Sequence, residues 1–315
     1  MNDPDILLLR QKVHGLPVSR YASALRERLP DVDIAVAETP AEERELAANA
    51  RVISGFSMDE ELLGNADALE LFACCFAGYG HLPLDAFEAA GVPVTNASGV
   101  HGPNISEYVV GALVSMARNF ERARRQQEEQ VWQAFGSREL KGSTVTVVGL
   151  GAIGQAVVER LEPFGVDTIG VRYTPEKGGP TDEVLGFDQI HEAFSDTDAV
   201  VLACPLTDAT EGLVGYDEFR TLPPHAHLVN IARGGVVDTD ALVNAIRSHH
   251  IAAAFLDVTD PEPLPSDHPL WGFDNVTITP HNAGHTPQYY DRLADILAEN
   301  YRRLERGEEL ENRVR

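Results

Sequence analysis

The stretch Val145-Thr146-Val147-Val148-Gly149-Leu150-Gly151-Ala152-Ile153-Gly154 decides the fold. An apolar strand runs into the pattern G-x-G-x-x-G, and a helical pattern follows. Gly149 permits a tight turn, Gly151 lets the main chain approach a pyrophosphate, and Gly154 lets the helix pack on the strand. The helix N-terminus would direct N–H groups at the anion. The stretch predicts a dinucleotide-binding turn, with a structural turn or a methyl-donor site as alternatives. The predicted cofactor-binding residues of this turn are Gly149, Gly151, Ala152, Ile153 and Gly154.

Strand and helix patterns alternate on both sides of this turn. Such alternation implies parallel strands joined by right-handed crossovers, with helices on both faces of the sheet. We therefore expect an α/β protein with two doubly wound, Rossmann-like parallel-sheet domains, of which 143–281 is a complete nucleotide-binding unit. A long helical pattern runs from 105 to 117 and on toward 132. The predicted strands are 6–9, 32–36, 52–53, 71–76, 92–95, 145–148, 168–171, 199–203, 228–231, 253–256 and 276–278.

The composition indicates a folded, acidic protein. Its 315 residues suit two domains of roughly 100–200 residues each. The 49 Asp and Glu residues against 25 Lys and Arg residues give a formal charge of −24, which repels phosphates and anionic lipids. We therefore expect neither nucleic acid nor membrane among its partners. Lysine occurs only at Lys12, Lys141 and Lys177. This acid-rich, lysine-poor composition resembles that of halophilic proteins, and plain solubility is the alternative.

The cysteines and histidines predict a cytoplasmic protein without a metal. Cys74, Cys75 and Cys204 are odd in number and lack a spacing motif, which argues against a disulfide framework or a zinc site. No histidine pair has a metal-binding spacing such as H-E-x-x-H. The first residues are acidic, unlike a signal peptide, and the apolar runs fall short of the roughly 18–20 residues of a membrane span.

The second strand of the nucleotide-binding unit predicts the cofactor. About 20 residues after the glycine turn, an Asp or Glu would accept from the ribose 2′-hydroxyl. Here the strand ends Gly170-Val171-Arg172-Tyr173-Thr174, with Arg172 where the acid would stand. A guanidinium pairs with a 2′-phosphate and stacks on adenine, and Thr174 offers a hydroxyl. We expect that Arg172, Tyr173 and Thr174 bind the cofactor and that NADP(H) is preferred while NAD(H) is tolerated. The alternative is a solvated surface arginine.

Three polar residues follow later strands of the same unit. Arg233, Glu262 and His281 each stand just past an apolar run, and the carboxyl ends of parallel strands form the ligand crevice. An arginine can bind a substrate carboxylate through two hydrogen bonds. A histidine can protonate a developing alkoxide, and a carboxylate can fix its tautomer. This set suits hydride reduction of a 2-keto acid by nicotinamide. Singly, each residue also suits a loop arginine, a helix-capping glutamate or a hydrogen-bonded core histidine.

Together, these residues and motifs resemble the D-isomer-specific 2-hydroxyacid dehydrogenase family. The resemblance covers nearly the whole chain. These motifs identify the family but do not identify the substrate. The similar stretches are 77–81, 91–118, 147–154, 204–207 with Thr210, 230–238, 257–264 and 267–284.

The resemblance implies a domain organisation. A discontinuous substrate-binding domain would comprise 1–100 plus 286–315, and the dinucleotide-binding domain would comprise 101–285. The active site would lie in the cleft between them. Members of the family are usually homodimers that pack through the cofactor domain, which would give the segment 122–135 a role.

The resemblance also implies residue roles. Arg233 would bind the substrate carboxylate, Glu262 would orient His281, and His281 would be the general acid/base. The main chain of Ala77, Gly78 and Tyr79 would hold the carboxylate from the other domain. Further cofactor contacts would come from Asn104, Pro205, Thr210, Ile231 and Asp257, the last through the carboxamide.

This chain departs from the common family pattern at one position, and two alternative functions remain. Many members of the family carry Asp where this chain has Arg172. The members similar to glyoxylate/hydroxypyruvate reductase often resemble this chain at that position. The first rival is a non-catalytic NAD(H)-sensing corepressor on the same scaffold. Two observations argue against this alternative: we see no long disordered tail in the sequence, and the set of Arg233, Glu262 and His281 is intact. The second is formate oxidation, which needs no carboxylate-paired acid, so Glu262 argues against it.

Overall fold

The computed structural model describes residues 3–13 and 15–314 and divides into two compact units. The first contains the chain up to Val100 and from His285 onward, and the second runs from His101 to Gly284. The second domain boundary was predicted before residue 286, and the structure places it one residue earlier, before His285. The two α/β units with parallel sheets confirm the predicted fold class. The active-site cleft between the domains stays a prediction.

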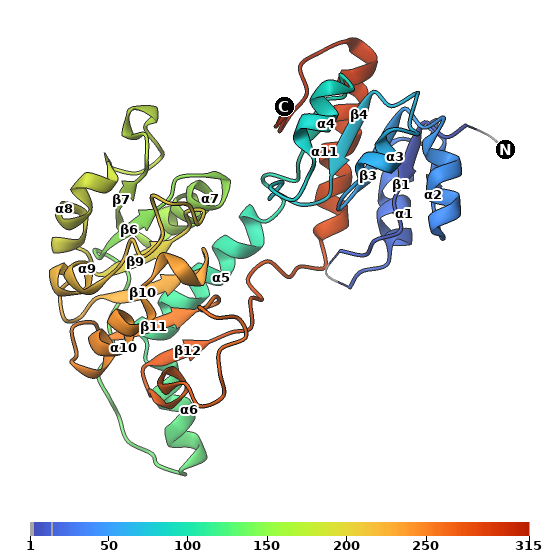
Figure 1. The fold of residues 1–315 in the computed structure, drawn as a ribbon. Coiled ribbons are helices and arrows are strands. Elements are labelled where there is room, and N and C mark those ends of the chain that lie inside the picture. The colour runs from blue at the N-terminus through green and yellow to red at the C-terminus, as the bar shows by residue number, and fades with distance from the viewer. Residues whose placement is uncertain (1–2, 14, 315) are drawn as a thin grey trace. The chain divides into compact units, whose positions relative to one another are not determined.

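The first unit is a five-stranded parallel sheet with the order β2-β1-β3-β4-β5 (Figure 1). One apolar core packs α1 and α11 on one face, and a second packs α2, α3 and α4 on the other. The carboxyl end of β4 runs into the loop that carries Ala77, Gly78 and Tyr79. The elements are β1 (Ile6–Leu8), α1 (Val18–Arg28), β2 (Ile34–Val36), α2 (Pro40–Ala47), β3 (Val52–Gly55), α3 (Glu60–Leu63), β4 (Leu71–Cys74), α4 (Leu84–Ala89), β5 (Val94–Thr95) and α11 (Tyr289–Arg306).

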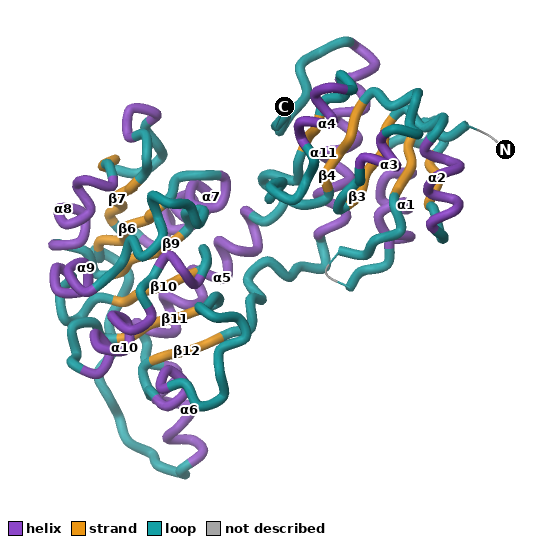
Figure 2. The backbone as a smooth tube through the Cα atoms, in the orientation of Figure 1, coloured by secondary structure: helices purple, strands orange, loops and turns teal. Residues whose placement is uncertain are grey.

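The second unit is a seven-stranded parallel sheet with the order β12-β11-β10-β9-β6-β7-β8. Figure 2 shows its strands in orange between purple helices. Helices α5 and α7 pack on one face, and α8, α9 and α10 pack on the other. The elements are α5 (Gly102–Ala117), α6 (Phe120–Glu128), β6 (Thr144–Val148), α7 (Ala152–Leu161), β7 (Asp167–Val171), β8 (Glu183–Leu185), α8 (Ile190–Ser195), β9 (Ala199–Leu202), α9 (Tyr216–Thr221), β10 (His227–Asn230), α10 (Thr239–Arg247), β11 (Ala253–Leu256) and β12 (Val276–Ile278). Short 3-10 helices lie at Glu162–Phe164, Pro175–Lys177, Phe187–Gln189, Gly234–Val236 and Pro269–Gly272.

Two details differ from the sequence expectation. The helical pattern from 105 toward 132 breaks at Asn119, whose left-handed φ of 53° separates α5 from α6. Strand β8 (Glu183–Leu185) was not expected, because three residues at a sheet edge leave no readable alternation. Neither difference moves the strand ends that carry the predicted site, since β6 and β9 to β12 lie in the predicted positions.

Candidate active site

The glycine turn after β6 has the geometry that the sequence predicts. Gly149 has a φ of 100°, and a Cβ there would lie 2.6 Å from the amide nitrogen of Cys204. A Cβ on Gly154 would lie 1.9 Å from the carbonyl oxygen of Gly149. The protein's own packing therefore demands both glycines. At Gly151 a Cβ would meet no protein atom within 4 Å, so the space beside this residue is open.

Helix α7 begins directly after the turn. Gly151 is its N-cap and has no side chain to accept from the first N–H groups. These groups and the positive end of the helix dipole are therefore available to an anion. Ala152 and Ile153 lie in the first turn of α7, where predicted. The turn has the features of a phosphate-binding site.

A cavity of about 710 Å³ adjoins the glycine turn and the end of β7. Its charged side chains are Arg172, Lys177 and Asp208. Arg172 Nη1 donates to the carbonyl oxygen of Gly178 at 2.5 Å, which holds the loop after β7. Tyr173 is largely exposed. The predicted residues that line this cavity are Gly149, Gly151, Arg172, Tyr173, Thr174, Pro205 and Thr210.

Thr210 also lines this cavity. Its hydroxyl donates to the carbonyl oxygen of Pro205 at 2.6 Å and accepts from the amide of Thr207 at 2.8 Å. Since the side chain is buried, its hydroxyl fixes the turn at 205–210. Asn104 and Ile231 do not line this cavity. The Asn104 amide donates to the carbonyl oxygen of Ala283 at 2.8 Å, and Ile231 is buried in the core beneath α5 and α7.

His281 and Glu262 lie in contact past the ends of β12 and β11. His281 Nδ1 is 3.0 Å from Glu262 Oε2. The other carboxylate oxygen, Oε1, accepts from the amide of Thr259 at 3.1 Å, so the main chain orients the glutamate. Because Nδ1 faces the carboxylate, Nε2 remains for another partner. The side chains are 49% and 39% exposed, so a ligand can reach the imidazole.

A second cavity, of about 540 Å³, lies at this pair. Glu262, Leu264, Trp271, Pro280 and His281 are among its lining residues. Apolar side chains supply part of the lining, and the polar lining residues include the histidine and the glutamate. The imidazole therefore adjoins a cavity that is lined in part by apolar side chains.

Arg233 lies in the loop after β10, beside the loop that carries Glu262. A Cβ on Gly234 would lie 2.0 Å from the carbonyl carbon of Thr259, so this glycine is required for the two loops to touch. Arg233 Nη1 donates to the carbonyl oxygen of Ala232 at 2.6 Å, and the residue is exposed. No carboxylate of the described residues pairs with its guanidinium. The structure shows no direct contact between Arg233 and His281.

Asp257 anchors the turn that carries His281. The carboxylate is 2% exposed and accepts from the amides of Asn282 at 2.8 Å and Ala283 at 2.9 Å. It also accepts from the hydroxyls of Thr279 at 2.7 Å and Tyr108 at 3.1 Å. Asp257 was expected to bind the carboxamide of a cofactor, and its oxygens already have four donors. It lines the cavity at His281.

Sequence reasoning missed Tyr108 and Thr279 as parts of this network. The two hydroxyls also contact each other. Burial raises the pKa of Tyr108 above its ordinary value, so the phenol is neutral and donates. His281 has a φ of 52°, and its amide donates to the carbonyl oxygens of Asp257 and Thr279. Thr279 stands two residues before His281, whereas no motif distinguishes Tyr108 on α5.

The remaining predicted site residues, Ala77, Gly78 and Tyr79, belong to the first unit. They lie in the loop after β4, and Tyr79 is 41% exposed. Their contact with substrate stays a prediction.

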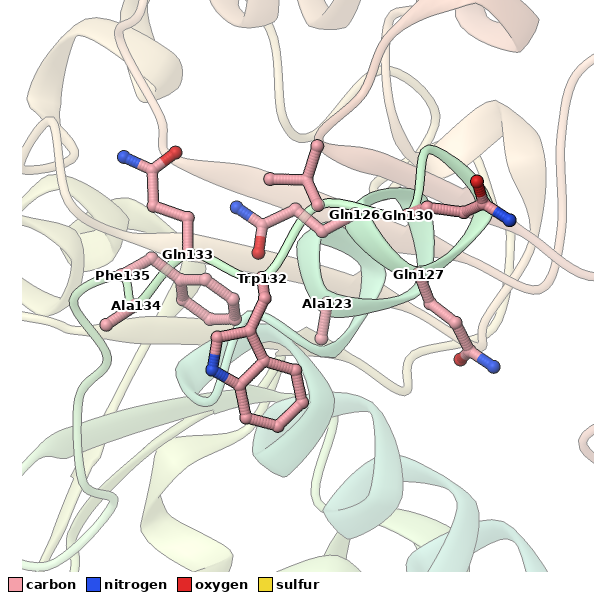
Figure 3. Close-up of a pocket in the computed structure, with 9 residues that line it drawn as sticks. Ala123, Gln126, Gln127, Gln130, Trp132, Gln133, Ala134 and Phe135 are labelled. Carbon is pink, nitrogen blue, oxygen red and sulfur yellow. The ribbon is translucent and has the colours of Figure 1, made fainter.

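A third cavity, of about 720 Å³, lies between α6 and the segment after it (Figure 3). Trp132 is fully exposed there, and the guanidinium of Arg122 lies 5.0 Å from the ring centre of Phe135. All three residues lie in the segment 122–135, which was expected to mediate dimerisation.

Other titratable groups lie apart from these cavities or are buried. Burial raises the pKa of Cys75 to about 12 and that of Cys204 to about 11, so both thiols are protonated near neutral pH. Within the described ranges, no three His, Cys, Asp or Glu side chains cluster as metal ligands. No described helix is both long and apolar enough for a membrane span.

Comparison with known proteins gives consistent similarities. Residues 110–283 match a sequence model of the family described as D-isomer specific 2-hydroxyacid dehydrogenase, NAD binding domain. D-3-phosphoglycerate dehydrogenase from Methanocaldococcus jannaschii is 32% identical over 304 residues, which cover 95% of this chain and 58% of that protein. This chain therefore spans little more than half the length of that relative. Glyoxylate reductase from Thermofilum pendens is 34% identical over 260 residues, covering 80% of this chain and 76% of that one.

A solved structure is similar over both units. The D-isomer specific 2-hydroxyacid dehydrogenase from Xanthobacter autotrophicus, in complex with NADPH and MES, has a TM-score of 0.81 and 30% sequence identity. The similarity covers 99% of this chain and 98% of that chain.

Proposed function

Because this chain belongs to the D-isomer-specific 2-hydroxyacid dehydrogenase family, we propose that it reduces small 2-keto acids to D-2-hydroxy acids. The family and its relatives support a nicotinamide-dependent 2-hydroxyacid dehydrogenase activity. The substrate class and the residue roles are the proposal. The relatives named glyoxylate reductase support small keto acids as substrates.

The contact between His281 and Glu262 carries the proposal. With Nδ1 held 3.0 Å from the carboxylate, Nε2 can carry a proton toward a substrate carbonyl oxygen. Glu262 accepts from Nδ1 and so holds the tautomer and the orientation of the imidazole from which that proton is given. The exposed guanidinium of Arg233, which has no carboxylate partner among the described residues, binds the substrate carboxylate. The apolar side chains of the 540 Å³ cavity beside the imidazole would limit the water around a bound substrate.

The residues of the second unit fit a dinucleotide. The open space at Gly151 and the uncapped start of α7 suit a pyrophosphate, and the 710 Å³ cavity suits an adenosine. Pro205 and Thr210 line its wall. When bound, the nicotinamide supplies the hydride.

The proposed cofactor is NADP(H) in preference to NAD(H). Arg172 and Lys177 both line the cavity, and β7 is followed by Arg172 rather than by an acid that would repel a 2′-phosphate. A hydrogen bond to a charged group contributes about 1.5–3 kcal/mol, so Arg172→Ala should lower the NADPH-to-NADH preference about tenfold or more. The ratio of the two Michaelis constants, measured in both proteins, tests this, and an unchanged ratio defeats it.

We also propose that the enzyme is a cytoplasmic homodimer. All three cysteines are free and buried, as suits a reducing compartment. The exposed apolar side chains after α6 suit contact with a second copy. The corepressor alternative is not favoured, because the Arg–Glu–His set is present.

A screen of NADPH oxidation tests the proposed function. Purified protein is mixed with glyoxylate, hydroxypyruvate, pyruvate and branched 2-keto acids, at low and at molar salt. Turnover with at least one of them, giving the D-hydroxy acid by chiral chromatography, is the expected result. Binding of NADPH without turnover of any keto acid would favour the corepressor alternative instead.

A further inference from the structure

The loop after β4 is held by three successive carbonyl groups. The hydroxyl of Tyr289 donates to the carbonyl oxygen of Cys75. The amide of Ala97 donates to that of Phe76 at 3.1 Å. The side-chain amide of Asn96 donates to that of Ala77 at 2.6 Å. The backbone therefore enters the loop with its carbonyls fixed toward the body of the unit.

The hydrogen bonds that hold these carbonyl groups also set the direction of the main-chain N–H groups that follow them. In a trans peptide the C=O and the following N–H lie in one plane and point in opposite directions. The amides that follow Phe76 and Ala77 therefore point away from the body of the unit. No described residue accepts a hydrogen bond from the N–H of Ala77, Gly78 or Tyr79. Gly78 and Tyr79 are exposed, so these donors are accessible to a ligand.

From this geometry we infer that Asn96 is a positioning residue for the substrate carboxylate. By holding the carbonyl of Ala77, it aims the amide of Gly78 at an anion. Successive main-chain amides of this kind bind anions. The inference rests on the proposed function, because it assigns these amides to the carboxylate of the 2-keto acid.

The surroundings of Asn96 suit this role. The side chain is 8% exposed, and its Oδ1 accepts from the amide of Ser98 at 3.2 Å. Its main-chain N–H donates to the carbonyl oxygen of Asn312 at 3.1 Å. Both ends of the side-chain amide are thus engaged, which leaves it one orientation. An aspartate would keep the acceptor for Ser98 but could not donate to Ala77.

Two variants and one control test the inference. Asn96→Asp keeps the shape and removes the donor, and Asn96→Ala removes the side chain. The control, Asn65→Ala, removes another side-chain amide of the same unit that donates to a main-chain carbonyl, that of Glu61 at 2.9 Å. For each protein, kcat and KM are measured with glyoxylate, the Kd of NADPH by fluorescence, and the melting temperature by calorimetry.

Both Asn96 variants should raise KM for glyoxylate about tenfold or more, because hydrogen bonds to a charged group are lost. The value of kcat and the Kd of NADPH should stay near those of the unmodified protein, since a loss of uniform binding raises KM alone. A purely structural role would lower the melting temperature and leave KM unchanged. That outcome overturns the inference, as does an equal rise in KM in Asn65→Ala.

Binding of oxalate separates this inference from the proposed function. Oxalate is titrated by calorimetry into each protein with saturating NADP⁺, which needs no turnover. Weaker binding to both Asn96 variants than to the unmodified protein supports the inference even if no keto acid is reduced. Equal binding to all three, or binding to none, overturns it.

Discussion

Replacing Glu262 by glutamine tests how the acid/base group is held. The glutamine keeps the size of the side chain and an oxygen to accept from the amide of Thr259, but it removes the charge beside His281. Glu262 Oε2 and His281 Nδ1 are 3.0 Å apart, and both side chains are partly solvated. With the dielectric constant of water, two unit charges at that distance attract by about 1.4 kcal/mol. The loss of this attraction corresponds to about a tenfold lower rate.

The assay is the initial rate of NADPH oxidation with the best keto acid of the screen. We expect Glu262→Gln to lower kcat/KM about tenfold while the Kd of NADPH stays unchanged. Glu218→Gln is the matched control, since Glu218 lies 3.4 Å from His191 in another histidine–glutamate pair of the same unit. An unchanged kcat/KM in Glu262→Gln, or an equal loss in the control, would refute the reasoning.

Three further predictions concern the second unit. Gly154→Ala should lower the free energy of unfolding in urea, because its Cβ would lie 1.9 Å from the carbonyl oxygen of Gly149. Gly151→Ala should instead weaken NADPH binding with little effect on the free energy of unfolding. Equal effects of the two substitutions on both quantities would contradict this. Burial lowers the pKa of His227 to about 4, so between that pH and its ordinary pKa near 6.5 the unfolded state binds more protons. The free energy of unfolding should therefore fall as the pH drops through this window. In His227→Gln, the free energy of unfolding measured with urea should depend less steeply on pH. Trp132→Ala should shift the mass measured by light scattering toward the monomer, and an unchanged dimer mass would place the interface elsewhere.

The strand ends and the glycine turn could be predicted because their signals are local. The glycines at 149 and 154 are required by contacts within a few ångströms of the turn. The pairing of Glu262 with His281 follows from parallel topology, which brings the ends of β11 and β12 to one edge. The expected cofactor contact of Asp257 stays a prediction, and the sequence did not predict what holds its carboxylate. Its position was predicted, but its four donors come from α5 and the turn at 279–283.

The parts that could not be predicted depend on packing between distant segments. Tyr108 stands on a helix 149 residues from Asp257 in sequence, and nothing in its neighbourhood marks it as a donor. Asn96 is similar, because its partner Ala77 is reached only through the arrangement of β4 and β5. Strand β8 is too short for an alternating pattern.

The measurement closest to the central claim is turnover and NADPH binding by His281→Ala, side by side. If the imidazole delivers the proton, keto-acid reduction falls to the background rate while the Kd of NADPH matches that of the unmodified protein. Retention of most of the turnover, with cofactor binding intact, would show that another group protonates the substrate and would contradict the account.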